Sequence, residues 1–119
     1  MAIQTVYASA ARTATPTAVT INTRRAKALV VVFDVTAVTS TPSTIVTIDG
    51  FDSLSNSYFT ILASAAIATA VKTVLRVGVG LTAATNLTVA DYLPDQVRVT
   101  ATHGNANSMT YSISAHLLD

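Results

Sequence analysis

Two histidines and a pair of neighbouring aspartates are the side chains of this sequence that could bind a metal ion. A zinc site needs three or four converging ligands, and His103 and His116 have no cysteine and no cluster of other ligands near them in the sequence. Asp49-Gly-Phe-Asp52 places two carboxylates around a glycine, as calcium loops do, but it lacks the EF-hand spacing and the closing glutamate. Turn-forming aspartates are the alternative interpretation. We therefore expect no metal ion and no other cofactor.

The sequence contains none of the residue patterns that usually mark a catalytic centre. Serine is abundant, but the G-x-S-x-G sequence of a nucleophile elbow is absent. Gly78-Val-Gly80 lacks the third glycine and the following lysine of phosphate-binding loops. The chain has no cysteine, which removes thiolate nucleophiles and disulfides. No two aspartates stand out as an acid–base pair, so the sequence predicts a protein that is not an enzyme.

Basic residues gather at one point of a chain that carries few charges. Arg24, Arg25 and Lys27 supply three of the seven lysines and arginines. This cluster is either a docking patch for an acidic partner or a solvated strand edge, where cations discourage unwanted pairing. The formal net charge is only +1, so the chain lacks the basic surface of a nucleic-acid-binding protein. No apolar run approaches the ~20 residues of a membrane span, and neither nucleic acid nor a membrane is expected as a partner.

The low content of charged residues bears on how the surface is used. Charged residues make up 11% of the chain, less than half of the usual share of about a quarter. All six acidic residues are aspartate, which favours turns, and glutamate, which favours helices, is absent. A surface with so few charges is either buried against other subunits or coated with threonine and serine in a soluble monomer.

The segment from Ala28 to Val38 has the strongest strand pattern. One face carries four alternating apolar residues: Leu29, Val31, Phe33 and Val35. Val30 and Val32 stand on the opposite face, so both faces are apolar at the start of the strand. Because a two-layer protein covers only one face of each sheet, the second cover must be the N-terminal arm, a loop or another subunit. Val30 and Val32 are therefore candidate interface residues.

Short β-rich runs separated by polar turns fill much of the remaining chain. Residues 44–62 predict a hairpin around a polar turn, with four residues facing inward: Val46, Ile48, Phe59 and Ile61. Residues 63–70 indicate a loop or strand edge or, because alanine favours helices, a helical turn. The final alternating runs, 96–102 and 108–117, flank a glycine-containing stretch of five residues and predict a second hairpin.

A long connection from Gly78 to Gln96 is the best candidate for a contact surface outside the strands. Connections longer than about 12–15 residues are uncommon and often functional. Residues 88–93 could form one helical turn that stops at Pro94. Tyr92 lies in this connection, and tyrosine is enriched at protein interfaces. We therefore expect Tyr92 to lie at an interface.

These signals together predict an all-β fold, an antiparallel β-sandwich of the jelly-roll-like or Greek-key type. About seven or eight short strands with turn signals between them are typical of such sandwiches. Residues 27–119 would form the sandwich domain, and residues 1–26 an N-terminal arm or edge strands. No charged segment followed by an apolar one marks a secretory signal, so we expect synthesis in a cytoplasm.

A set of short motifs runs through residues 44 to 118. The first are Ile48-x-Gly50-x-Asp52, Ser57-Tyr-Phe-Thr-Ile-Leu-Ala-Ser64, and Val74-Leu-Arg-Val77 before Gly80-Leu-Thr82. The others are Asp91-Tyr-Leu-Pro-Asp-Gln-Val-Arg-Val99, Thr102-His-Gly-Asn105 and Ser108-Met-Thr-Tyr-Ser112. As a set, these motifs resemble small structural proteins of tailed bacteriophages.

The resemblance implies a non-enzymatic virion component that is made in the cytoplasm of a bacterial host. The first expectation is a capsid decoration (cementing) protein on the head surface. Such a protein would form homo-oligomers, commonly trimers, and bind the major capsid protein or other virion proteins. Arg24, Arg25 and Lys27 would then dock on an acidic capsid surface.

Two alternatives to the decoration protein stay open from the sequence. One is a tail-tube, connector or other minor tail protein, which would assemble into rings or tubes. The other is a carbohydrate-binding β-sandwich module, in which exposed aromatic residues such as Tyr58 and Tyr92 would stack on sugars. The copy number in a virion would separate the first alternative from a head protein.

Overall fold

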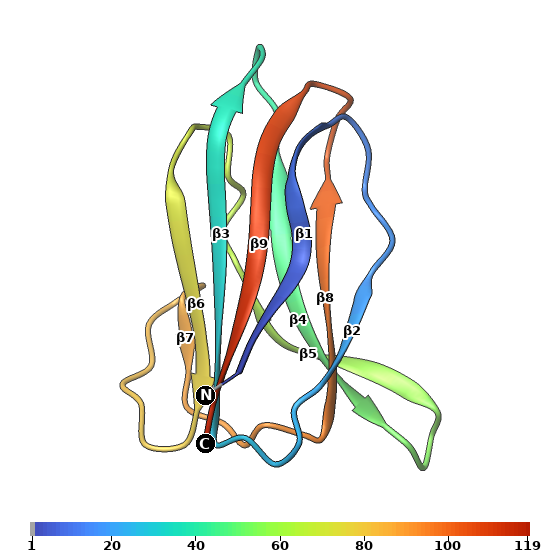
Figure 1. The fold of residues 1–119 in the computed structure, drawn as a ribbon, viewed down its shortest axis with the longest axis vertical. Coiled ribbons are helices and arrows are strands. Elements are labelled where there is room, and N and C mark those ends of the chain that lie inside the picture. The colour runs from blue at the N-terminus through green and yellow to red at the C-terminus, as the bar shows by residue number, and fades with distance from the viewer. Residues whose placement is uncertain (1) are drawn as a thin grey trace.

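The computed structural model describes residues 2–119 as nine strands in two facing sheets, with no helix among them (Figure 1). The strands are β1 (Ala2–Arg12), β2 (Val19–Asn22), β3 (Ala28–Val38), β4 (Thr44–Asp52), β5 (Ser57–Ala63), β6 (Lys72–Gly78), β7 (Thr88–Val89), β8 (Gln96–His103) and β9 (Met109–Leu118). The predicted all-β sandwich is confirmed. The expected strand number was slightly low because β7, with two residues, gives no pattern of its own.

The two sheets have the strand orders β1-β9-β3-β6-β7 and β2-β8-β4-β5. All neighbouring strands are antiparallel except β6 and β7, which are parallel. Only the β4–β5 and β6–β7 links stay within one sheet, and every other connection crosses to the opposite sheet. Strands that are neighbours in the sequence are therefore seldom neighbours in a sheet.

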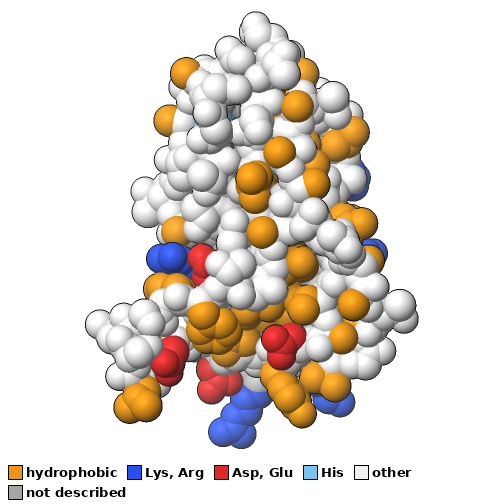
Figure 2. Space-filling model, turned by 180° about the vertical axis from the view of Figure 1, so that it is seen from behind, with side chains coloured by type: hydrophobic (Ala, Val, Ile, Leu, Met, Phe, Trp, Pro, Cys, Tyr) orange, Lys and Arg blue, Asp and Glu red, His pale blue; other side chains and the backbone are white. Residues whose placement is uncertain are grey.

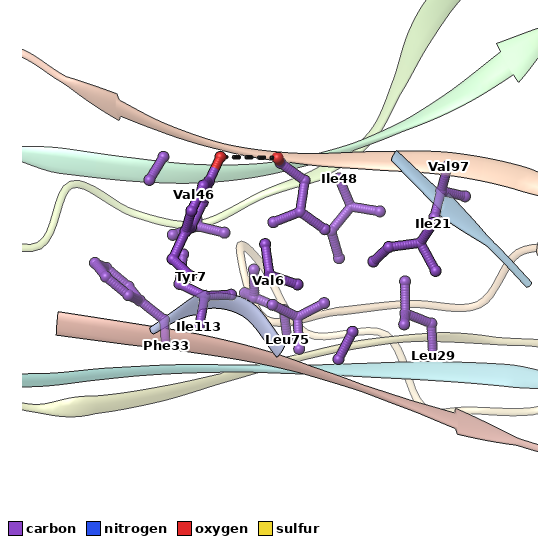
Figure 3. Close-up of a cluster of buried hydrophobic side chains, with 14 of the residues drawn as sticks. Val6, Tyr7, Ile21, Leu29, Phe33, Val46, Ile48, Leu75, Val97 and Ile113 are labelled. Carbon is purple, nitrogen blue, oxygen red and sulfur yellow. Dashed lines mark hydrogen bonds between the residues drawn. The ribbon is translucent and has the colours of Figure 1, made fainter. Parts of the chain in front are cut away.

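Alternating apolar residues from both sheets fill the space between them (Figure 3). β3 buries every second residue from Leu29 to Val35, and β9 does so from Met109 to Leu117. The opposite sheet adds Val46, Ile48, Val97, Val99 and Ala101. The inward faces predicted for these strands are confirmed. Full burial of each large apolar side chain contributes about 1.5 to 3 kcal/mol, so this interior supplies most of the driving force for folding.

The first two strands lie at the outer edges of the two sheets. β1 pairs with β9 and shifts register between Thr5 and Tyr7 and again between Tyr7 and Ala10. The first bulge allows two consecutive residues, Val6 and Tyr7, to be buried, and the Tyr7 hydroxyl donates to the Thr17 carbonyl oxygen at 2.7 Å. β2 pairs with β8. The segment expected as an arm or edge strands thus gives one edge strand to each sheet, and Met1 lies outside the described residues.

The predicted hairpins have different outcomes. Residues 44–62 form the β4–β5 hairpin, with Val46 and Ile48 fully buried. Phe59 was expected to be buried, but it is 50% exposed, because the tip of this hairpin extends beyond the opposite sheet (Figure 1). The second predicted hairpin is wrong: β8 and β9 belong to different sheets, and residues 104–108 carry the chain from one to the other.

Neither of the two possible helical turns forms. Ala63 ends β5, residues 64–70 are irregular, and the backbone of Ile67 makes an isolated bridge to Thr44. Residues 88–93 begin with β7, in which Thr88 pairs with Arg76 of β6. In both places backbone pairing with a distant strand outweighs the local helix propensity.

One end of the sandwich carries three loops, the start of β1 and the C-terminus, at the bottom of Figure 1. The loops are the β2–β3 turn at residues 23–27, the β4–β5 tip at 53–56 and the connection at 79–95. We call this the loop end. Three segments that are far apart in the sequence therefore meet on one surface.

Candidate functional site

The turn from Thr23 to Ala26 at the loop end has an unusual backbone for its sequence. The Ala26 amide donates to the Thr23 carbonyl oxygen at 2.9 Å, and the central residues Arg24 and Arg25 have φ angles of 51° and 62°. Two positive φ values in such a turn are the pattern of type I′, which glycine, asparagine and aspartate dominate. Each residue held in this region without glycine costs about 1 to 3 kcal/mol.

The turn is fixed to the long connection through Thr23, which is buried. The Thr23 amide donates to the Asp95 carbonyl oxygen at 2.8 Å, and its hydroxyl donates to the Pro94 carbonyl oxygen at 2.7 Å. On the other side of the turn, the Lys27 amide donates to the Leu118 carbonyl oxygen at 2.7 Å. The strained turn is thus held at both ends by the body of the sandwich.

The structure brings two of the predicted interface segments together at the loop end. Arg24, Arg25 and Lys27 are exposed, and within residues 2–119 none of them forms an ion pair. Tyr92 is 80% exposed and lies two residues before Pro94, which bonds to the turn. Figure 2 shows cationic side chains projecting at this end beside apolar and acidic ones. The loop end therefore offers cations, an aromatic ring and apolar surface in one place.

Val30 and Val32 lie elsewhere, on the outer face of the five-stranded sheet. In the sheet register Val30 stands between His116 of β9 and Arg76 of β6, and Val32 stands between Ser114 and Val74. Both valines are half-buried, and no strand of residues 2–119 packs over them. The N-terminal strand extends the sheet edge and does not cover this face.

A shallow hollow of about 350 Å³ lies on this outer face. Its lining is Val30, Val32, Val74, Arg76, His116 and Leu118. Val30 and Val32 were expected from the sequence, but the other four were not. They come from β6 and β9, and only the strand order places them beside β3. We call this set of six residues the outer hollow.

The outer face of the smaller sheet carries a group of polar and aromatic contacts. Arg98 Nε lies 3.0 Å from Asp49 Oδ2, and the Arg98 guanidinium lies over the Tyr58 ring, 4.0 Å from its centre. Tyr58 also packs against Phe51, with ring centres 5.0 Å apart, and its hydroxyl accepts a bond from Gln96 Nε2. Asp49 is thus bound to an arginine, and the Tyr58 ring has little free face on which a sugar could stack.

A third polar group joins β1, β8 and β9 at the end of the sandwich opposite the loop end. His103 Nε2 shares a hydrogen bond of 2.8 Å with the Tyr111 hydroxyl. Burial raises the pKa of Tyr111 to about 12. Burial, and secondarily the positive charge of Arg12, lowers the pKa of His103. His103, the last residue of β8, is therefore part of a packed polar contact.

Among residues 2–119 there is no group of three histidine, cysteine or acidic side chains that could hold a metal ion. The same part of the chain has no helix long and apolar enough to cross a membrane. The titratable groups Asp49 and His103 are bonded to other side chains, and the outer hollow has valines at its centre.

The chain matches no protein-family model, no curated protein and no solved structure. The loop end and the outer hollow are thus the two candidate functional surfaces of the protein.

Proposed function

We propose that the protein is a non-enzymatic structural protein of a bacteriophage virion, a capsid decoration protein on the head surface. It would be made in the bacterial cytoplasm and would bind its own copies and the major capsid protein. The observation that carries this proposal is the outer hollow, in which Val30 and Val32 face away from an already filled interior. Apolar surface that the fold does not cover is typical of a contact surface.

The distribution of charge also supports a role in assembly. Only 11% of the residues are charged, so most of the surface can be buried without removing charges from water. Each Å² of apolar surface buried contributes roughly 25 cal/mol. Repeated over many copies on a shell, such contacts would strengthen the shell without any chemical step.

A trimer is the oligomer that fits a decoration protein and two different apolar surfaces. A threefold ring requires each copy to use one surface on one neighbour and a different surface on the other. The outer hollow is the first of these two surfaces. The second contains Phe59 and Leu87, whose side chains are 50% and 44% exposed, in or beside β5 and β7, the edge strands farthest from β1 and β2. Figure 2 shows apolar side chains gathered over the lower half of the molecule.

Light scattering after size exclusion tests the role of the outer hollow. We expect a trimer for the natural protein and a monomer for Val32→Lys, whose charge would be buried at the contact. Because Val32 is only half-buried, the variant should still fold, as circular dichroism would show, while loss of the trimer should lower its melting temperature. Thr100→Lys, half-buried on the smaller sheet, is the matched control and should stay trimeric.

The same proteins can then be added to heads that lack the decoration protein and sedimented. We expect the natural protein and Thr100→Lys to sediment with the heads, and Val32→Lys to do so much less. If the natural protein is a monomer, and if it and Val32→Lys sediment equally well with the heads, the outer hollow has no role in assembly. Rings, tubes or sixfold copy numbers would instead favour the tail-tube or connector alternative.

A further inference from the structure

We infer that the Thr23–Ala26 turn is a preformed contact in which Arg24 and Arg25 bind carboxylates on an acidic protein surface. This inference rests on the proposed function, because the acidic surface is taken to belong to the shell on which the protein sits. To the docking residues expected from the sequence it adds a turn whose backbone holds Arg24 and Arg25 in position for carboxylates.

The two central residues of the turn are unusual for its backbone conformation. Arg24 and Arg25 both occupy the left-handed region, where asparagine followed by glycine would be favoured. The side chain of Asn22 accepts a bond from the Arg24 amide at 3.0 Å, which supports the turn but needs neither arginine. Strained backbone is found at functional sites more often than elsewhere. The two guanidinium groups are thus kept at a cost in stability that a contact outside the chain would explain.

The turn is held at both ends, and its two guanidinium groups have no ion-pair partner among residues 2–119. Thr23 and Lys27 anchor both sides of the turn by three backbone and side-chain hydrogen bonds. A binding group that is already in position loses little conformational entropy on binding, and arginine binds carboxylates through two parallel hydrogen bonds.

The surroundings of the turn favour a protein partner over a nucleic acid. Asp91 and Asp95 are exposed in the connection that bonds to the turn, so carboxylates as well as cations lie near it. A protein surface can place cations opposite these aspartates, whereas an evenly charged phosphate backbone cannot. The net charge of +1 gives no further attraction for a polyanion. Tyr92, between the two aspartates and 80% exposed, belongs with arginine to the residue types that dominate protein–protein binding energy.

Nuclear magnetic resonance with a hexaglutamate peptide as the probe tests the inference on the free protein. At low salt we expect saturable shifts at the amide and Nε groups of Arg24 and Arg25 and at the amide of Tyr92. Affinity should fall at least severalfold in about 150 mM salt. Absence of saturable shifts at these residues would overturn the inference. So would equal or tighter binding of a phosphate-bearing oligonucleotide of the same charge.

Three variants separate the contact from the fold. R24Q/R25Q removes the charges, and R24N/R25G removes both the charges and the backbone strain. Both should lose at least tenfold in peptide affinity, and the second should also melt several degrees higher, about 4 °C or more. K72Q removes an exposed cation from β6 and should change neither property. If R24N/R25G melts no higher than R24Q/R25Q, the strain argument fails and the inference with it.

Sedimentation with heads distinguishes the failure of this inference from failure of the proposed function. Equal sedimentation of the natural protein and R24Q/R25Q would overturn the inference and leave the decoration role standing. If the natural protein does not sediment with heads while its hexaglutamate binding is specific to the turn, the decoration role fails and the carboxylate contact stands.

Discussion

The guanidinium carbon of Arg12 lies 4.7 Å from the centre of the Tyr111 ring, and Arg12 Nη1 donates to the Tyr111 carbonyl oxygen at 2.8 Å. Arg12 Nη2 donates to the carbonyl oxygen of Ala8, at the second bulge of β1. The arginine therefore satisfies carbonyl groups that the bulge leaves out of the regular ladder and ties the end of β1 to β9.

Replacing Arg12 by methionine should weaken the attachment of β1. The stem of the side chain would be kept, while the hydrogen bonds to carbonyl groups and the cation–π contact would be lost. We expect a decrease of about 1 to 3 kcal/mol in the free energy of unfolding, measured by urea denaturation. Lys72→Met, at an exposed position, should stay within about 0.5 kcal/mol. An equal loss in both variants would contradict the role assigned to Arg12.

The stability of the protein should fall as the pH is lowered through the titration of His103. Its pKa is lowered in the folded state by burial and by the Arg12 charge, so the folded protein favours the neutral ring. The stabilising contribution is complete above the unfolded-state pKa of about 6.5 and is lost as the pH falls through the lower folded-state pKa. Melting temperatures between about pH 7.5 and 5 should show this loss, and His103→Gln should reduce it. His116→Gln is the matched control and should show the same loss of stability as the natural protein. If His103→Gln also shows the full loss, groups other than His103 cause it.

Gly50 should not tolerate even a methyl group. A Cβ atom there would lie 2.7 Å from Phe59 Cζ, 2.9 Å from Pro94 Cγ and 3.0 Å from Ile61 Cδ1, and the proline ring can move little. We expect Gly50→Ala to lower the unfolding free energy by about 1 to 3 kcal/mol. Gly104→Ala, where the nearest atom would be 3.5 Å away, is the control and should be close to neutral. Thermal and urea unfolding of the two variants would give the comparison, and a neutral Gly50→Ala would show that the connection can shift.

The Asp49–Arg98 pair should respond unequally to loss of either partner. The Asp49 side chain is only 10% exposed, against 38% for Arg98. Arg98→Met leaves a nearly buried carboxylate without its cation, whereas Asp49→Asn leaves an arginine that still packs on Tyr58. We expect Arg98→Met to cost about 1 kcal/mol more than Asp49→Asn in urea denaturation. The opposite order would mean that Asp49 keeps enough water to stay charged alone.

The sequence was sufficient to predict most of the residues that face the core and insufficient to predict which strands pair. Alternation placed Leu29, Phe33, Val97 and Ile113 correctly, because the side-chain period of a strand is a local property. The partner of each strand depends on contacts between distant segments. For that reason β8 and β9 were wrongly joined in a hairpin, although both inward faces were right.

The candidate surfaces divide in the same way. Arg24, Arg25 and Tyr92 could be proposed from residue type alone, and Val30 and Val32 from a strand with two apolar faces. The positive φ angles of the arginines were not predictable, because arginine carries no signal for the left-handed region. Arg76 and His116 flank Val30 only through the order β9-β3-β6, which no local pattern encodes.

The strand order has a consequence for how the protein is made. β1 pairs with β9 and β2 with β8, so the first two strands of the domain have partners that are translated after all the strands between them. The outer edge of one sheet closes only with β9, which begins 97 residues after the end of β1, and that of the other only with β8, which begins 74 residues after the end of β2. Such a high contact order is associated with slow folding, and the unpaired early strands are open to association in the meantime. The three charges in residues 24–27, translated soon after β2, would help to keep that waiting segment apart from its copies.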